Sequence, residues 1–290
     1  MLELTDTVLQ GLMLGCFYAL SGLGLSLSFG IMRIVNIAHG DFLVLASYLG
    51  VVIVALTGLN PLLAVPVIVP LMFAVGYVLQ RALLNRVVVG GELSPMLVTF
   101  GLSIILHNAL QEIFSADFKS LDAGAIEVAS LSVAGLHIGW LPLSMALLAL
   151  CTFAALHLVM ARTRFGRIVR ATVDDPEMTA LTGVDPRRVY ALGMGLSMAI
   201  VAVAGSLYGI KSSFNPMAGG DQLLFAFETV IIGGMGSIWG TLAGGLALGL
   251  SQVFGLKLGA GWGAFAGHVM FFLFLFVRPN GLLARTNPHA

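Results

Sequence analysis

Charged side chains are scarce in this sequence. Only 10% of its 290 residues are Asp, Glu, Lys or Arg, and 58% are hydrophobic, whereas a soluble domain carries about 25% charged residues. So few charged groups cannot cover a surface that faces water, and lipid must therefore be the solvent for most of the molecular surface. The formal net charge is zero, so nothing indicates a nucleic-acid partner.

Cysteine is nearly absent, and so are the motifs of soluble catalytic domains. Cys16 and Cys151 both lie in apolar runs, which favours packing residues over a disulfide or a metal site. The histidines and acids show no metal-ligand spacing. No connection between apolar runs is long enough for a soluble domain, and no glycine-rich phosphate-binding loop with a lysine occurs. Whatever drives this protein must lie on another chain, unless its action is passive.

Long apolar runs, by contrast, fill the chain. A helix of about 20 apolar residues spans a bilayer and keeps its backbone hydrogen bonds internal. Asn60, Ser94 and Asp185 each stand before a proline, the arrangement of a capped helix start. The sequence therefore predicts an all-α, polytopic transmembrane bundle of about eight or nine spans. These are expected near 8–30, 37–57, 62–84, 95–114, 140–160, 189–210, 222–236, 238–256 and 262–278.

Two of these segments need comment. The first residues carry Glu3 and Asp6 but no basic residue, unlike a cleaved signal peptide, so we expect the first run to be a retained helix. The segment 222–236 is too short for a comfortable crossing. A broken or re-entrant helix there leaves the count open between eight and nine.

The distribution of basic residues predicts the orientation. Segment 161–188 holds six arginines, whereas 115–139 holds only Lys119 against three acids. Because cytoplasmic connections are enriched in Lys and Arg, we expect 161–188 to be cytoplasmic and 115–139 external. Nine spans then place the N-terminus outside and the C-terminus inside. The arginines used are Arg33, Arg81, Arg86, Arg162, Arg164, Arg167, Arg170, Arg187, Arg188, Arg278 and Arg285.

Segment 161–188 also contains a short predicted helix. Asp175 suits an N-cap, Pro176 a first helical position, and Gly183 a stop. Met178 and Leu181 lie three residues apart, on one face. Such a short helix is marginal alone, which favours docking into a partner. The alternative is a solvated basic loop, which explains the arginines but not two capped helix starts, at Asp175 and Asp185.

Three stretches resemble a known family. EMTALTGVDPRRV at 177–189 resembles the cytoplasmic coupling loop of ABC importer permeases. GIMRIVNIAHGDF at 30–42 and IIGGMGSIWGTLAGG at 231–245 resemble the early and late glycine-rich signatures of branched-chain amino acid permeases. The resemblance spans nearly the whole chain. It implies an ABC importer permease fold, with 1–290 as one permease domain that carries branched-chain or related amino acids. Relatives carry urea, short amides or other amino acids.

The resemblance also implies partners and sites. A bacterial inner-membrane permease of this kind works with a second homologous permease, two ATP-binding cassette subunits and a periplasmic binding protein. ATP and Mg would be held by the cassette subunits, with no cofactor on this chain and no chemistry of its own. The implied ATPase-coupling residues are Pro176, Glu177, Met178, Ala180, Leu181 and Gly183, and the glycine-rich signature includes Gly233, Gly234, Gly236 and Gly240.

Four polar residues lie in or near apolar segments: Asn36, His39, Asp41 and Glu228. A charge at membrane depth costs at least about 2.5 kcal/mol, so it must face protein or water. The first three either form a broken-helix turn that shapes a translocation path or binds a substrate ammonium, or form an interfacial turn in which Asn36 caps the second helix. Glu228 either pairs with Lys211 or another basic residue, or lines the path. We expect His268 to be a hydrogen-bonded packing residue.

Two rival functions stay open. A passive channel or secondary transporter would need no docking helix. An intramembrane enzyme would need convergent Ser and His or paired carboxylates at membrane depth, and the few candidates lie on different segments.

Overall fold

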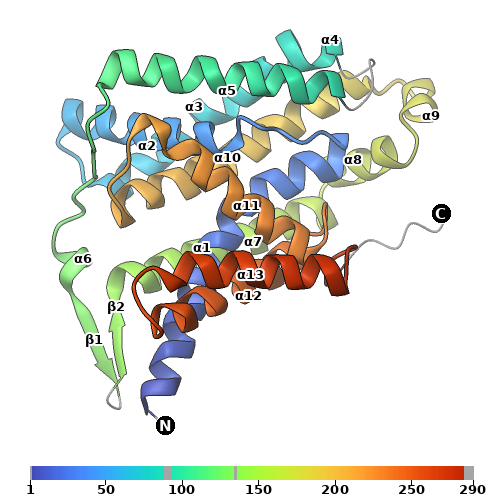
Figure 1. Ribbon diagram of the computed structural model, residues 1–290. Helices are drawn as coiled ribbons and strands as arrows, with labels where there is room; N and C mark the ends of the chain where they lie inside the picture. The colour runs from blue at the N-terminus through green and yellow to red at the C-terminus, as the bar shows by residue number, and fades with distance from the viewer. Residues whose placement is uncertain (1, 88–92, 134–135, 284–290) are drawn as a thin grey trace.

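The computed structural model describes residues 2–87, 93–133 and 136–283, and helices dominate it (Figure 1). The long helices are α1 (Leu2–Met32), α2 (His39–Thr57), α3 (Pro61–Leu79), α5 (Leu93–Phe114), α7 (Trp140–Arg162), α10 (Pro186–Lys211), α11 (Gly219–Gly233), α12 (Ile238–Leu256) and α13 (Trp262–Val277). The shorter elements are η1 (Gln80–Leu84), α4 (Asn85–Val87), α6 (Ala125–Val128), β1 (Ser130–Val133), β2 (Leu136–Gly139), α8 (Arg164–Asp174), α9 (Pro176–Leu181) and η3 (Pro216–Ala218).

All nine expected spans are helical within the described ranges. Seven helices are long and apolar enough to cross a membrane there. The two others, α11 and α13, have 15 and 16 residues, which extend about 22 and 24 Å, less than the roughly 30 Å of a bilayer core. The segment expected at 222–236 ends at a break after Gly233, as its short length suggested.

Helix starts follow the capping signals in two of three cases. The Asn60 side chain accepts a hydrogen bond from the Leu62 amide at 3.0 Å, and Asp185 caps α10. The expectation that Ser94 caps the fourth span differs from the structure by one position, because α5 starts at Leu93 and Ser94 is its second residue.

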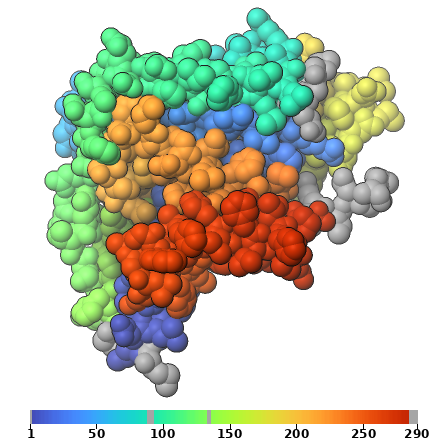
Figure 2. Space-filling view, in the orientation of Figure 1, coloured from blue at the N-terminus to red at the C-terminus, as the bar shows by residue number. Residues whose placement is uncertain are grey.

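The bundle has an inner and an outer set of helices. In the most apolar stretch of α1, 83% of residues are buried, and in that of α10 72%. The corresponding shares are 22% for the span that starts with α3 and 17% for α5. The outer helices present large apolar side chains, such as Phe276, to the surroundings, and α5 and α13 lie on the outer surface in Figure 2. A surface of this kind suits lipid.

Glycines allow the interior helices to touch. A methyl group at Gly245 of α12 would lie 2.5 Å from the backbone nitrogen of Ala19 in α1, and one at Gly249 would overlap the backbone of Gly15. Without a hydrophobic force between helices in lipid, close backbone approach supplies the packing energy. The glycine richness of the sequence therefore serves tight helix contacts at this interface.

Opposite ends of the bundle carry different connections. The antiparallel hairpin β1–β2 lies near the start of α1, whereas α8, α9 and the end of α13 lie at the other end (Figure 1). This separates the arginine-rich segment 161–188 from the arginine-free connection 115–139, as the sequence predicts; Arg285 and part of 81–94 lie outside the described residues.

Candidate functional site: an exposed helix, a buried polar turn and a basic cavity

Helix α9 has the local structure that its sequence predicts. The Asp175 carboxylate accepts hydrogen bonds from the amides of Glu177 and Met178 at 3.0 and 2.9 Å, and Pro176 occupies the first position. The helix ends before Gly183, whose φ of 88° lies in the left-handed region that glycine adopts without strain. The cap and the stop together hold a helix of six residues.

The surface of α9 is apolar and exposed. Leu181 is 83% exposed and Met178 61% exposed. Thr179 is buried, on the face of α9 that packs against α8 and α10. Glu177 and Ala180 are also exposed. In Figure 1, α9 projects from the edge of the bundle beyond α8. An exposed apolar patch on a fixed element is typical of an interaction surface.

Helix α8 was not anticipated from the sequence. It is amphipathic and starts at Thr163, whose hydroxyl accepts a hydrogen bond from the Gly166 amide at 3.2 Å. The signal was present, since a threonine cap precedes apolar residues at helical spacing. The many arginines of this stretch instead led to the prediction of a basic connection without a helix before Asp175.

A short connection links α9 to the interior. Residues 182–185 lead into α10, where the Asp185 carboxylate accepts from the Arg187 amide at 3.0 Å. Helix α10 then packs against α1, α2 and α3. A displacement of α9 would therefore reach the centre of the bundle through one capped helix start.

The polar residues before and within α2 are buried. Asn36, His39 and Asp41 are 1%, 0% and 4% exposed. The Asn36 side chain accepts from the Ala38 amide at 3.1 Å, but the cap residue of α2 is Ala38, without a side-chain cap bond. The expectation that Asn36 caps α2 is therefore wrong in detail, because Asn36 instead stabilises the turn that precedes the helix.

The first turn of α2 packs on the backbone of α11, and its His39 side chain reaches α1. The His39 Nε2 lies 2.8 Å from the backbone oxygen of Ser21 in α1. A methyl group at Gly40 would overlap the backbone of Gly219 in α11, and one at Gly219 would overlap the Asp41 carboxylate. The signature around residues 36–41 therefore places α2 directly against α11, where Gly40 and Gly219 leave no room for a side chain.

Glu228 has a partner that the sequence did not single out. Its Oε1 lies 2.5 Å from Nδ1 of His268 in α13, and the His268 ring stacks on Phe225 with centroids 5.8 Å apart. Lys211 lies over the Phe17 ring instead, 4.8 Å from its centroid. Glu228 therefore pairs with His268, not with Lys211. His268 is a hydrogen-bonded packing residue, as expected.

Glu228→Ala is expected to destabilise the protein by about 1–3 kcal/mol, because His268 loses its partner while the buried site loses its carboxylate. Thermal unfolding of the purified protein in detergent would measure this. Glu228→Gln is the matched control, since it keeps the shape and a hydrogen-bonding group. Equal melting temperatures for the alanine and glutamine variants would contradict the expectation.

The buried polar turn before α2 and Glu228 have separate partners. His39 contacts the backbone of Ser21 in α1, whereas the Glu228 carboxylate contacts His268 in α13. Within the described ranges, no hydrogen bond joins Glu228 to the first turn of α2.

The late glycines form the turn between α11 and α12. A methyl group at Gly233 would overlap the backbone of Gly240, and Gly234 and Gly236 have positive φ values of 101° and 79°. The amides of Leu282 and Leu283 donate to the backbone oxygens of Ile232 and Gly233 at 2.8 and 3.0 Å. This signature therefore has a structural account, as a tight turn that anchors the chain after α13.

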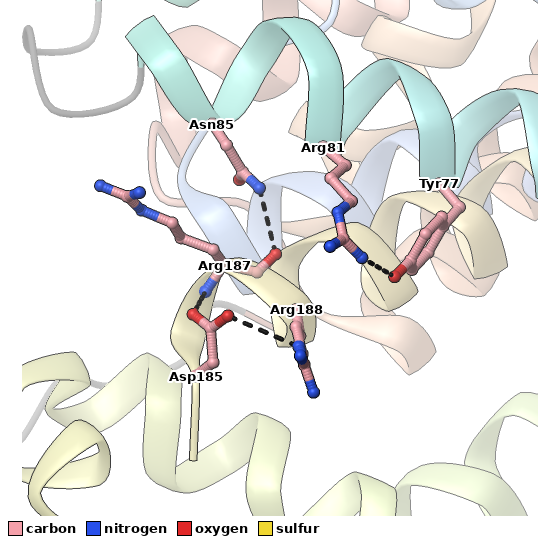
Figure 3. A network of polar contacts seen from close by, with 6 residues as sticks. All are labelled: Tyr77, Arg81, Asn85, Asp185, Arg187 and Arg188. Atoms are coloured by element: carbon pink, nitrogen blue, oxygen red, sulfur yellow. Dashed lines mark hydrogen bonds and ion pairs between the residues drawn. The ribbon is translucent and has the colours of Figure 1, made fainter. Parts of the chain in front are cut away.

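A basic cavity of about 520 Å³ lies at the same end of the bundle as α9. The carbonyl oxygen of Arg187, at the start of α10, accepts a hydrogen bond from Asn85 of α4 at 3.2 Å (Figure 3). Sequence reasoning used these arginines only for orientation, since it could not place two separate connections side by side. The lining residues are Arg81, Asn85, Arg86, Asp185, Arg187 and Arg188.

The described part of the chain holds no candidate metal site. No group of three or more His, Cys, Asp or Glu side chains there could hold a metal ion.

Together, the lipid-facing bundle, its backbone-to-backbone interior contacts and the projecting α9 define a polytopic membrane permease. Comparison with known proteins gives the particular family. The model of the permease component of branched-chain amino acid transport systems matches residues 7–278, and the chain therefore belongs to this family of ABC transporter permeases.

Curated relatives agree over nearly the whole length. The chain is 30% identical over 293 residues to the high-affinity branched-chain amino acid transport system permease protein BraD of Pseudomonas aeruginosa, covering 96% of this chain and 95% of the relative. It is 29% identical over 298 residues to LivH of Escherichia coli, covering 95% and 94%. A fructose import permease protein, FrcC of Rhizobium meliloti, is 39% identical over 107 residues, 34% of this chain and 29% of the relative.

Proposed function

We propose that this chain is the permease subunit of an ATP-driven importer that carries branched-chain or related amino acids across a bacterial inner membrane. It forms one permease domain. It acts with a second homologous permease, two ATP-binding cassette subunits and a periplasmic binding protein. ATP and Mg are held by the cassette subunits, and this chain contributes the membrane path and the coupling contact.

The observation that carries the proposal is the exposed apolar surface of α9. Leu181 and Met178 face outward on a helix that is capped at one end and stopped by Gly183 at the other. A passive channel has no use for such a surface. A separate ATPase that grips α9 would move α10, the neighbour of α1, α2 and α3, and so alter the bundle interior.

Movement of α10 would also change the surroundings of the buried polar residues. Ser197 of α10 donates a hydrogen bond to the Gly24 backbone oxygen of α1 at 2.6 Å, close to His39, whose ring a methyl group at Gly24 would approach to 3.3 Å. Separation of these helices would uncover His39 and Asp41. In this proposal Asn36, His39, Asp41 and Glu228 belong to the translocation path in a conformation other than the one described.

The proposed orientation places α8, α9 and the end of α13 in the cytoplasm. The arginines of 161–188 support it through their cytoplasmic preference. The start of α1 lies at the opposite end, beside the β1–β2 hairpin (Figure 1), and is therefore external in this proposal.

Uptake by the reconstituted complex tests the proposal. The full set of subunits would be placed in vesicles, and labelled leucine, urea and acetamide would be supplied with the binding protein. We expect leucine uptake that requires internal ATP and stops after ATP depletion. Uptake that persists without ATP would favour a passive channel or a secondary transporter, and uptake of urea or acetamide alone would reassign the substrate.

A further inference from the structure

The basic cavity is built from two segments that lie far apart in sequence. Arg81, Asn85 and Arg86 come from η1 and α4, which extend α3, whereas Arg187 and Arg188 begin α10. The hydrogen bond from Asn85 to the Arg187 carbonyl joins them. The cavity is therefore a feature of the tertiary fold, and it does not follow merely from arginines being common in cytoplasmic connections.

The buried Gln80 and the half-buried Tyr77 hydrogen-bond to residues of the cavity wall. Gln80 is fully buried and donates to the Asn85 Oδ1 at 3.0 Å. The Tyr77 hydroxyl accepts from Nη1 of Arg81 at 2.9 Å (Figure 3). Gln80 lies in a π-helical turn, a local widening that is frequent at functional sites. These contacts hold Asn85 and Arg81 in place.

The described lining of the cavity carries a net positive charge. Among the described residues, four arginines line it with one acid, Asp185, whose carboxylate is already engaged by the Arg187 amide and by Nε of Arg188 at 3.7 Å. Arg86 and Arg187 have no carboxylate partner among the described residues. Guanidinium groups match phosphate oxygens in pairs, so the cavity suits a phosphate-bearing anion.

An apolar stripe leads along α3 toward this cavity. Leu63, Val67, Leu71 and Val78 recur at helical spacing and are 61%, 47%, 46% and 60% exposed. Arg81 follows Val78 by three residues and is also exposed. The span from Pro61 to Val87 has 27 residues, about 40 Å at 1.5 Å per residue. It therefore exceeds the roughly 30 Å hydrocarbon core and reaches headgroup level at its arginine end.

We propose that this cavity binds the phosphate of one anionic phospholipid, with the acyl chains along the exposed stripe of α3. Basic pockets between transmembrane helices on the cytoplasmic side bind acidic headgroups. The occupied site would tie the end of α3 to the start of α10, the helix that continues from α9. The binding site requires only membrane insertion of the described fold, so it stands apart from the proposed substrate and ATPase.

Binding to the unmodified chain is the first test. The full-length protein in detergent would be mixed with phosphatidylglycerol or phosphatidylcholine of identical acyl chains, and bound lipid counted by native mass spectrometry. We expect the first phosphatidylglycerol to bind at least about tenfold more tightly than phosphatidylcholine. Equal binding of the two lipids overturns the proposal. Displacement of the bound lipid by millimolar inorganic phosphate also overturns it, since the site would then serve free phosphate.

Charge variants locate the bound lipid. The double variant Arg86→Gln, Arg187→Gln is expected to lose the preference by about tenfold or more, whereas Arg86→Lys, Arg187→Lys should retain most of it. The matched control is Arg164→Gln, Arg167→Gln, which removes two exposed arginines from α8, outside the cavity. Melting curves would verify that each variant is folded. An equal loss in the control and cavity variants would show general surface attraction and overturn the proposal.

Discussion

Leu181→Asp is expected to reduce ATP-dependent substrate uptake by about 30-fold, while the protein still folds and inserts. Loss of one interface anchor typically costs about 2 kcal/mol or more, and 1.4 kcal/mol corresponds to tenfold. An aspartate in the proposed ATPase groove would also be a buried charge without a partner. Uptake into vesicles that contain the complete transporter would measure the loss, together with the amount of ATPase retained by the purified permease.

The controls separate docking from folding. Leu181 is 83% exposed, so its replacement should change the stability of the isolated chain by less than about 0.5 kcal/mol. Leu181→Met keeps an apolar side chain of similar volume and should transport nearly as well as the unmodified protein. Normal uptake by the aspartate variant would refute the coupling role of α9.

Gly249→Ala is expected to lower the free energy of unfolding by at least about 1–3 kcal/mol. The added methyl group would overlap the backbone of Gly15, and a backbone atom cannot turn aside as a flexible side chain can. Helices α1 and α12 would have to separate along a contact that also includes Gly245 and Ala19. Chemical or thermal unfolding in detergent, and the amount of folded protein in the membrane, would report the loss.

Gly101→Ala is the matched control for that substitution. Gly101 also lies within an apolar helix, α5, but a methyl group there meets nothing within 4 Å. Since alanine is intrinsically the better helix former by about 1 kcal/mol, this variant should be neutral or stabilising. Similar behaviour of the Gly249 and Gly101 variants would show that close backbone approach is not what Gly249 provides.

Local signals predicted local structure well. Asp175, Pro176 and Gly183 form the capped start and the stop of α9, and Asn60 with Pro61 starts α3. Each of these features depends on atoms within a few residues of one another, so the relevant contacts are visible in the sequence. The same reasoning missed by one position at Ser94, which is the second residue of α5.

Contacts between helices were much harder to foresee. Glu228 and His268 are separated by 40 positions, and nothing in either neighbourhood distinguishes His268 from Lys211 as the partner. Asn85 and Arg187 are 102 positions apart. Their meeting depends on how α3 and α10 are rotated about their axes, and the basic cavity arises from that rotation.

The sequence by itself determined that lipid surrounds this protein, that its backbone must be helical, where most helices begin, and that its basic connections gather at one end. Only the tertiary structure decided which helices form the interior, that the first turn of α2 packs on α11, and which polar groups meet. The physical reason is that a lipid tail is as apolar as a leucine side chain. Hydropathy therefore reports immersion in the membrane, but it does not report which face of a helix meets protein.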